Sequence, residues 1–538
     1  MNFGCLPLAA AGRTESQDMY SFANMLRRAV LVNRHGIATR FEGRQTSWAE
    51  TLERVQRLAS ALQRLGIGPG DRVAILAGNS DLYVELLFAI PWAGGVVVPI
   101  NTRLASEEIA HCLADSGSRL LIVDDGFLRA ARQLHALAPE LAQLVYAGHA
   151  AGAAADCVNL DALLASCGPV ADAGRGGTDL FALYYTGGTT GRSRGAMLTH
   201  QGMITNTLQW IFEIGVGRDD LLLVVAPMFH LVGGLNAIAA AALGAGLYLM
   251  PRFEPRAVLQ AIERERVTKA ALVPTMINAI VAHPDIAKFD LSSLRRISYG
   301  GSPISETLLR RTLEVLPQAL LYQVYGQTEG GPNISVLKPE DHRIAADGGS
   351  RLGSAGQPII GTEVVILDKD EAVLAAGEVG EICVRGLTVS PGYWNLPEET
   401  AHAQRGGWLH TGDAGYLDAD GYLYIVDRIK DMIITGGENV YCQEVENILY
   451  AHPAVAECAV FGIPDERWGE RVHAVVRLRE GCSASEDELI AHCRRHLAPY
   501  KCIRSVDFRS EPLPLSGANK ILKRDLRAAY WQSRSRAV

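Results

Sequence analysis

The segment of the sequence that points most clearly to chemistry is FALYYTGGTTGRSRGAMLTH, residues 181–200. An apolar strand is predicted to run into a loop rich in glycine and threonine, and a helix to follow the loop. Glycine lets the backbone approach a polyphosphate, and the amides and hydroxyls of Thr186, Thr189 and Thr190 can donate to its oxygens. The spacing does not fit the G-x-x-x-x-G-K-[ST] loop. The segment therefore predicts a phosphate-binding loop of another type, rather than an ordinary polar turn.

Two later segments carry groups that suit the rest of a nucleotide. In LYQVYGQTEGGP, residues 321–332, Tyr325 can stack on a base, Thr328 can bind phosphate and Glu329 can hold Mg²⁺. In the segment 410–441, Asp413 can accept hydrogen bonds from ribose hydroxyls and Arg428 can reinforce the same sugar. Each also has a purely structural interpretation. Residues 321–332 can form a solvated turn, Asp413 can cap a turn, and Arg428 can belong to a surface ion pair.

A lysine near the end of the chain is the fourth candidate. Lys520 follows the turn-like SGAN in PLPLSGANKILKRDLR, residues 512–527. Taken singly, a lysine in such a place is more often a solvated charge. We expect its neighbours Lys523 and Arg524 to be solvated charges.

The elements that must position these groups alternate between helices and apolar strands. A helix is predicted from the capping box of Ser47 and Glu50 to Gly66, followed by a strand at 72–77, a helix at 81–93 and a strand at 96–100. Uniformly apolar strands indicate a sheet covered on both faces, so the fold class is α/β. After about residue 360, short strands with Asp/Gly turns predict a small β subdomain, and an α+β pattern follows. We predict an N-terminal domain of layered α/β subdomains at 1–427 and a small C-terminal domain at 428–538.

Composition narrows the classes of protein. Of 538 residues, 48% are hydrophobic and 20% charged, which is typical of a globular chain with more than one domain. The net charge of −8 argues against a nucleic-acid partner. Ten cysteines without a CxxC pair favour free thiols in a reducing cytoplasm. The first residues make a poor secretory signal, and the apolar region 221–250 is too interrupted for a membrane span, so we expect a cytoplasmic protein.

In their order and spacing, the four segments resemble the adenylate-forming superfamily of acyl-CoA synthetases, peptide-synthetase adenylation domains and firefly luciferase. The resemblance covers residues 22–530. It implies that ATP, Mg²⁺ and CoA are used and that Glu329 and Thr186 hold the metal, with Thr328 at the α-phosphate. The remaining residues that the resemblance assigns to ATP bind its phosphates, adenine and ribose; they are Thr186, Gly187, Gly188, Thr189, Thr190, Gly191, Arg194, Gly301, Ser302, Pro303, Gln323, Tyr325, Gly326, Asp413 and Arg428.

The resemblance also assigns the catalytic cation and a domain rotation. Lys520 matches the lysine that bridges the acid carboxylate and the α-phosphate, where charge builds up in the transition state. Lys430 matches the hinge about which a mobile C-terminal domain rotates. The loop of Gly436 and Gly437 is then expected to line the tunnel for the CoA thiol, although a simple hairpin turn explains the same two glycines.

The chain departs from the usual family pattern at four positions. Gly187 stands where serine is typical, Ser193 where proline is typical, and Arg194 in place of lysine. Arginine keeps the charge and adds a planar fork, so we expect activity with altered phosphate geometry. Asn519 replaces a glycine before Lys520, and asparagine tolerates left-handed backbone angles better than most residues.

The acid-binding region favours an apolar acid. Phe229 and His230 stand where peptide-synthetase domains typically place an aspartate for an amino acid. Gly326 stands where acetate-specific relatives carry a tryptophan, and we expect it to leave room for a longer or aromatic acid. The resemblance implies a catalytic and pocket role for His230, in a pocket completed by Leu235, Met276, Tyr299, Gly326, Pro332 and Asn333.

An acid:CoA ligase is therefore the expected function, for medium or long acyl chains or for aryl and arylpropenoic acids. The alternatives are an adenylating enzyme that loads a carrier protein, a luciferase-like oxidation of the adenylate, and a non-catalytic nucleotide-binding protein. The expected partners are small molecules, without nucleic acid or a membrane span. The sequence does not distinguish a monomer from a homodimer.

Overall fold

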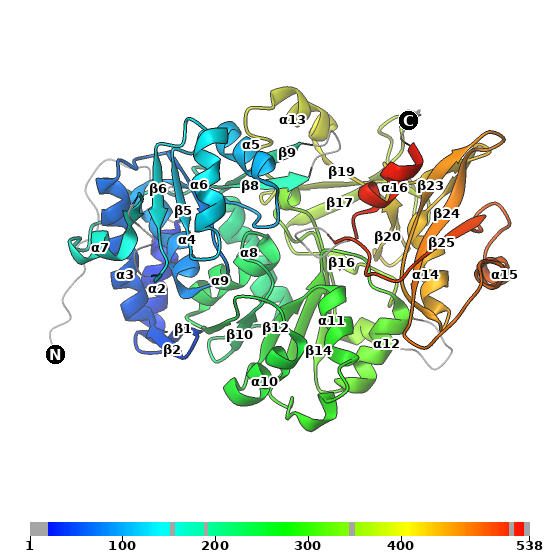
Figure 1. Ribbon diagram of the computed structural model, residues 1–538, viewed down its shortest axis with the longest axis horizontal. Coiled ribbons are helices and arrows are strands. Elements are labelled where there is room, and N and C mark those ends of the chain that lie inside the picture. Colours follow the sequence, from blue (N-terminus) through cyan, green and yellow to red (C-terminus); the bar gives the residue numbers. More distant parts are fainter. Residues whose placement is uncertain (1–19, 151–155, 188–191, 344–349, 516–520, 532–538) are drawn as a thin grey trace.

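The fold is described from a computed structural model, which covers residues 20–150, 156–187, 192–343, 350–515 and 521–531 (Figure 1). Two large sheets with helices on their faces form the first part of the chain, a small antiparallel sheet follows, and a further α+β unit ends it. The predicted α/β class is confirmed. The helix predicted at 47–66 is α3 (Trp48–Arg64), and Ser47 caps it with the expected capping box, in which Glu50 N donates to Ser47 Oγ at 3.3 Å.

The first large sheet has the strand order β7-β6-β5-β3-β4-β8-β9 and is parallel up to its last pair, β8 and β9. Its strands are mostly apolar on both sides, as a sheet covered by helices requires. The strands are β3 (Arg72–Leu76), β4 (Val96–Pro99), β5 (Leu120–Val123), β6 (Gln143–Tyr146), β7 (Val158–Asn159), β8 (Leu180–Gly187) and β9 (Ser193–Thr199). The helices between them are α4 (Asp81–Ala93), α5 (Ser106–Ser116), α6 (Leu128–Leu137) and α7 (Leu160–Ala165).

The second large sheet has the order β16-β15-β14-β13-β12-β10-β11-β1-β2. Its strands are β1 (Ile37–Phe41), β2 (Arg44–Ser47), β10 (Leu221–Val224), β11 (Gly246–Leu249), β12 (Lys269–Leu272), β13 (Arg296–Gly300), β14 (Leu320–Tyr325), β15 (Ser335–Leu337) and β16 (Gln357–Pro358). The associated helices are α2 (Phe22–Asn33), α3 (Trp48–Arg64), α8 (His200–Ile214), α9 (Leu231–Leu243), α10 (Pro255–Glu265), α11 (Pro274–Val281), α12 (Glu306–Val315) and the short η1 (Ile286–Lys288), η2 (Thr328–Gly330) and η3 (Pro339–His342).

One hydrophobic core joins the two large sheets. It contains apolar side chains of α2, α3, α4, α8 and α9 together with the inner faces of β3, β8 and β10. Phe22 and Phe181 stack with ring centroids 3.9 Å apart, and both are fully buried. Burying one large apolar side chain stabilises the fold by about 1.5–3 kcal/mol, so this layer holds the two sheets in a fixed relation. The ends of strands from both sheets can then contribute to one site.

The glycine-rich segment differs from its prediction in one element. A second strand, β9, returns antiparallel to β8 before α8 begins at His200, with Thr186 opposite Arg194. The sequence reasoning passed directly from the loop to a helix, which is wrong. Ala196 and Leu198 are buried and alternate with half-buried neighbours, the period of a strand, but the glycines and serine before them obscured this signal.

The small β subdomain is a sheet with the order β17-β18-β19-β20, antiparallel throughout. This confirms the change from helices to short strands that the Asp/Gly turns predict. Its elements are β17 (Thr362–Leu367), β18 (Gly380–Gly386), α13 (Pro397–Ala403), η4 (Arg405–Gly407), β19 (Leu409–Leu417) and β20 (Leu423–Arg428).

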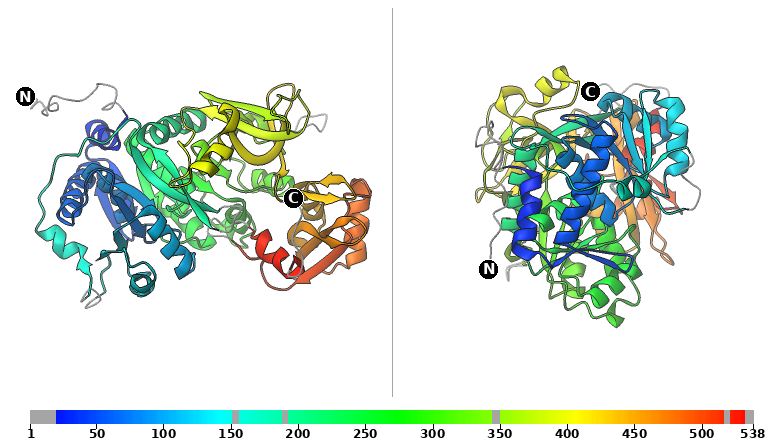
Figure 2. Two further views of the ribbon diagram at one scale, coloured as in Figure 1. Left: turned by 90° about the horizontal axis from the view of Figure 1, so that it is seen from above. Right: turned by 90° about the vertical axis from the view of Figure 1, so that its left-hand side faces the viewer.

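The last unit begins directly after β20. Its sheet has the order β22-β21-β24-β23, and β25 pairs with β24 in parallel. Its elements are β21 (Ile433–Thr435), β22 (Glu438–Val440), α14 (Cys442–Ala451), β23 (Val455–Asp465), β24 (Gly469–Leu478), α15 (Glu486–His496), β25 (Ser505–Arg509) and α16 (Lys523–Trp531). Figure 2 shows them grouped at the end of the molecule opposite the N-terminal helices. The chain changes sheet within residues 429–432, next to the predicted domain boundary.

Lys523 corrects one sequence expectation. It is not a solvated charge, because its Nζ lies 2.7 Å from Glu446 Oε1 inside the last unit. Burial alone would lower the pKa of Lys523, but Glu446, Cys442 and Asp427 outweigh this effect and raise it. Arg524 keeps an exposed side chain, as expected.

Two further observations concern the described part of the chain. None of its helices combines the length and the apolar character needed to cross a bilayer. Its cysteines are free thiols, which agrees with their scattered positions in the sequence.

Candidate active site

Three residues that the sequence assigned to a nucleotide meet between β14 and the small sheet. The hydroxyl of Tyr325, at the end of β14, donates to Asp413 Oδ2 at 2.8 Å. Asp413 and Arg428 are opposite each other on β19 and β20, and Arg428 Nε lies 3.4 Å from Asp413 Oδ1. Burial, aided by the Asp413 carboxylate, raises the pKa of Tyr325, so its hydroxyl stays protonated and donates. The arrangement presents a buried carboxylate beside an aromatic ring and an exposed cation.

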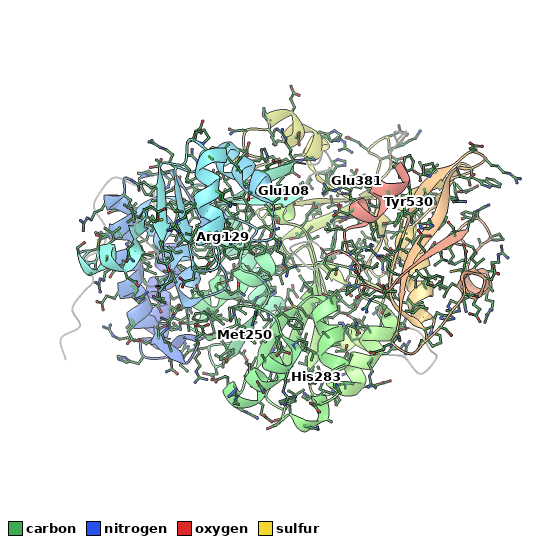
Figure 3. The ribbon with its side chains drawn as sticks, viewed as in Figure 1. Glu108, Arg129, Met250, His283, Glu381 and Tyr530 are labelled. Atoms are coloured by element: carbon green, nitrogen blue, oxygen red, sulfur yellow. The ribbon has the colours of Figure 1, made fainter. Side chains whose placement is uncertain are left out.

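The part of β19 that carries Asp413 is held by Glu381, which the sequence reasoning missed. Glu381 lies on β18 and is labelled in Figure 3. Its Oε1 accepts from the amide of Gly412 at 3.0 Å, and its Oε2 lies 2.8 Å from His410 Nδ1. The Thr411 hydroxyl donates to the carbonyl of Ile382 at 2.7 Å. These bonds fix the backbone that presents Asp413, and only the pairing of two distant strands reveals them.

The phosphate loop and the second motif meet through Thr186 and Glu329. The hydroxyl of Thr186, near the end of β8, donates to Glu329 Oε1 in η2 at 2.8 Å. Tyr393, which the sequence reasoning missed, donates its hydroxyl to the same oxygen at 3.1 Å. A carboxylate and a hydroxyl so close together are oxygen ligands of the kind that Mg²⁺ prefers. The residues present therefore fit a magnesium ion bound with a nucleotide.

Arg194 is held beside this pair. Its guanidinium forms an ion pair with Glu399 Oε2 at 2.7 Å and lies 5.2 Å from the ring centroid of Tyr393. Arg194 stands opposite Thr186 in the β8–β9 hairpin, so its charge is at the base of the phosphate loop. Stacking and a planar ion pair are contacts that arginine makes better than lysine, which gives a physical reason for arginine at this position.

The expected adenine wall lies at the ends of two neighbouring strands. Gly301, Ser302 and Pro303 follow β13, and Gln323 lies on β14 beside it. The hydroxyl of Tyr299 lies 3.3 Å from Gln323 Oε1 and 2.7 Å from His342 Nε2. Tyr299 is fully buried, so its hydroxyl is committed to these partners.

His230 caps the start of α9, and a residue that the sequence reasoning missed fixes the loop before it. The side chain of Asn79 accepts from Met228 N at 2.9 Å and donates to the carbonyls of Ala226 at 3.0 Å and Met250 at 3.2 Å. Met250 is labelled in Figure 3. Asn79 follows β3 of the first sheet, so it ties the two large sheets together at the entrance to α9.

The expected acid pocket is mostly apolar where its residues are placed. Leu235 on α9, Met276 on α11 and Tyr299 on β13 are buried, and Pro332 is half-buried. Asn333 differs, because its side chain donates to Asn206 Oδ1 at 2.5 Å on α8. That amide is therefore held against α8.

Gly326 is required by a close approach of two backbone segments. A Cβ atom built there would lie 1.9 Å from the carbonyl oxygen of Pro332 and 3.1 Å from the Cα of Asn333. The absence of a side chain is therefore explained by packing against the segment that follows η2.

We expect Gly326→Ala to destabilise the fold by about 1–3 kcal/mol, the usual cost of overpacking, because backbone atoms must move. Thermal unfolding checks this against Gly168→Ala, at which a Cβ meets no described atom within 4 Å. Equal melting temperatures for the two variants would contradict the packing explanation.

The C-terminal candidates lie on a hairpin and on the connection before it. Gly436 and Gly437 form the turn between β21 and β22, with φ of +62° and +85°. Gly436 N donates to the carbonyl of Trp468 at 2.8 Å. Lys430 is exposed between β20 and β21. The hairpin interpretation of the two glycines is correct, and a hairpin at this place is compatible with a tunnel role.

Several predicted residues lie outside the described part of the chain. They are Gly188, Thr189, Thr190 and Gly191 of the phosphate loop, together with Asn519 and Lys520. The described ends of these segments are the exposed Gly187 of β8 and Leu515, which bridges to Ile521.

Comparisons with known proteins agree with this arrangement of groups. The family model described as AMP-binding enzyme matches residues 26–394, and the AMP-binding enzyme C-terminal domain matches residues 444–520. The chain is similar to a feruloyl-CoA synthase of an Amycolatopsis species, with 43% identity covering 92% of this chain and 96% of that one. It is also similar to the fatty acid–[acyl-carrier-protein] ligase ScoC of Streptomyces coeruleorubidus, with 37% identity covering 92% and 94%.

A solved structure extends the likeness to the fold. The anthranilate CoA ligase AuaEII in complex with anthranoyl-AMP has a TM-score of 0.88 and 28% identity, covering 96% of this chain and 98% of that one. The chain therefore belongs to the AMP-binding enzyme family, the adenylate-forming superfamily that its motifs resemble. It is an AMP-forming acid ligase with a large N-terminal part and a small C-terminal one.

Proposed function

We propose that this AMP-forming acid:CoA ligase acts on an arylpropenoic acid such as ferulate. The observation that supports ATP-dependent ligation is the convergence of Thr186 on Glu329 and of Tyr325 on Asp413, from distant segments of the chain. The similarity to a feruloyl-CoA synthase over nearly the whole chain supports the choice of acid. Leu235, Met276 and Tyr299, which the resemblance assigns to the acid pocket, are buried and mainly apolar, the character that an aromatic ring needs.

In the first half-reaction, a carboxylate oxygen of the acid attacks the α-phosphorus of ATP, and the bond to pyrophosphate breaks. Asp413 accepts hydrogen bonds from the ribose hydroxyls, with Tyr325 and Arg428 holding its carboxylate in place. The loop that starts at Thr186 binds the phosphates, and Thr328 contacts the α-phosphate. Two anions meet in this step, so Lys520 stabilises the transition state more than the separated reactants.

Magnesium would be held by Glu329 and Thr186. When bound, it neutralises part of the phosphate charge. The chain's own contribution is positional, because Tyr393 and Thr186 orient the Glu329 carboxylate before a nucleotide arrives. His230 would stand at the entrance to the acid pocket, where the Asn79-held loop meets α9.

In the second half-reaction, the CoA thiol attacks the acyl carbonyl and AMP leaves. We place a domain boundary between residues 427 and 428, with Lys430 as the pivot that moves Lys520 away and brings the Gly436–Gly437 turn to the thiol. Such a rotation is a lid-type conformational step. Both positions have positive φ, which favours glycine, and glycine adds no side chain to the path that the thiol would follow.

A carrier protein is the second candidate acceptor, favoured by the similarity to ScoC. Both acceptors present the same phosphopantetheine thiol. They differ in the group that carries it, which is a nucleotide in CoA and a protein in the carrier. The first half-reaction is the same in either case.

Pyrophosphate release over a panel of acids tests the proposed function. The panel contains ferulate, cinnamate, benzoate, hexanoate and palmitate, each with CoA and with a phosphopantetheinylated carrier protein. We expect the highest kcat/KM with ferulate and a thioester with CoA. A preference for palmitate, or thioester only on the carrier protein, would contradict the proposal.

A further inference from the structure

A lysine is buried completely in the second large sheet, away from the nucleotide residues. Lys269 is the first residue of β12 and has no exposed surface. Its Nζ donates to Asn236 Oδ1 at 2.6 Å and lies 4.2 Å from the ring centroid of Trp210. A buried charge usually has an ion-pair partner or several acceptors. Among the described residues, Asn236 is the one hydrogen-bond acceptor of this ammonium.

The charge is costly where it stands. Burial lowers the pKa of Lys269 well below its ordinary value, and the more distant Asp220 offsets only part of that effect. An apolar residue of similar length would fill the space without this cost. A fully buried lysine with one hydrogen-bond acceptor is unusual in a hydrophobic core. Such exceptions are expected at functional sites.

Asn236 connects Lys269 to the expected acid pocket. Its Nδ2 donates to the carbonyl of Val232 at 2.7 Å, so the two residues lie one turn apart on α9, about 6 Å along the helix axis. Val232 faces the end of β13, because its Cγ2 lies 3.9 Å from the Cβ position of Gly301. Val232 and Asn236 therefore lie on the same side of α9. This side extends from the expected adenine wall at Gly301 to Asn236.

Strand register gives the depth of the lysine. Lys269 pairs with Arg296 and Leu272 with Tyr299 in the parallel strands β12 and β13. Lys269 is thus three residues, roughly 10 Å, below the level of Tyr299. This depth matches the scale of an arylpropenoic acid from its carboxylate to its para substituent. Side chains alternate along a strand, so Lys269 faces α9, whereas Leu272 and Tyr299 face the other side of the sheet. The apolar wall on the side of Lys269 is the buried Leu235 of α9.

We propose that Lys269, held by Asn236, donates a hydrogen bond to the hydroxyl at the far end of the arylpropenoic acid and selects acids that carry one. The proposal rests on the proposed function and names the group that the acid must present. An acid with an apolar end would leave the two remaining N–H groups of Lys269 without an acceptor. A site built to bond a hydroxyl discriminates strongly against an analogue that lacks it.

The test compares kcat/KM for 4-hydroxycinnamate and cinnamate in the wild type and in Lys269→Met. We expect the wild type to prefer 4-hydroxycinnamate by about 10²-fold or more. Lys269→Met should lower kcat/KM for 4-hydroxycinnamate by about 10–100-fold, the value of a hydrogen bond to a charged group, and leave cinnamate within about threefold. Lys269→Gln retains a donor and should restore part of the preference.

The matched control is Lys523→Met, which removes another inward-facing lysine. It should leave the ratio between the two acids unchanged, whatever it does to overall activity. An equal loss for both acids in Lys269→Met would overturn the proposal and leave Lys269 with a structural role. Equal use of the two acids by the wild type would also overturn it, even if no variant folds. Adenylation of fatty acids without any aryl acid would instead refute the proposed function itself.

Discussion

Replacing Lys520 with alanine is expected to slow acyl-adenylate formation on the order of 10³-fold, because a positioned electrostatic group at the reacting phosphate is lost. The affinity for ATP should change little, since the adenine, ribose and terminal phosphates keep their other contacts. The measurements are acid-dependent exchange of pyrophosphate into ATP and equilibrium binding of ATP. A loss in kcat without a comparable change in binding is what an interaction made only in the transition state produces.

The second half-reaction tests whether Lys520 acts only in adenylate formation or in both half-reactions. Thioester formation from a supplied acyl-adenylate and CoA should be much less affected by Lys520→Ala. Arg524→Ala is the matched control, because Arg524 is a nearby cation with an exposed side chain. Equal loss of both half-reactions would show that the role assigned to Lys520 is wrong.

Asp413→Asn is expected to raise the KM for ATP by about 10–100-fold, since hydrogen bonds to a charged acceptor contribute about 1.5–3 kcal/mol. Asparagine keeps the shape and still accepts from Tyr325, so the change removes mainly the charge that meets the ribose. Binding of ATP and of AMP, measured by calorimetry, should weaken together because both carry the same sugar.

Tyr325→Phe is the control for the Asp413 prediction. It removes the hydroxyl that holds the carboxylate at 2.8 Å but leaves the charge and the ring. We expect ATP affinity to fall by less than about tenfold, the scale of one neutral hydrogen bond. Unchanged ATP affinity in Asp413→Asn would contradict the ribose assignment.

The sequence predicted most of the elements because apolar patterning and caps are local. The helix capped by Ser47 and the helix at 442–451 need only their own residues to be recognised. The strand β9 was missed because glycine and serine hide its alternation, and pairing with β8 decides its conformation. Lys523 was misjudged for a related reason, because Glu446 approaches it from another element.

The candidate site was predictable as a set of motifs but not as a set of contacts. Thr186, Glu329, Tyr325 and Asp413 have the residue types that nucleotide chemistry needs, so the sequence could assign them. Glu381, Tyr393 and Asn79 act by holding other residues, and their partners are distant in the chain. Lys269 gave no signal at all, because a lysine beginning a short strand is ordinary until its burial is known.

The most direct test of the central claim is ATP–pyrophosphate exchange in the absence of CoA. With ferulate present, labelled pyrophosphate should enter ATP, and the omission of ferulate should abolish the exchange. This outcome requires reversible formation of an acyl-adenylate. If ferulate and the other acids of the panel support no exchange, or if ATP is cleaved to ADP and phosphate, the account is contradicted.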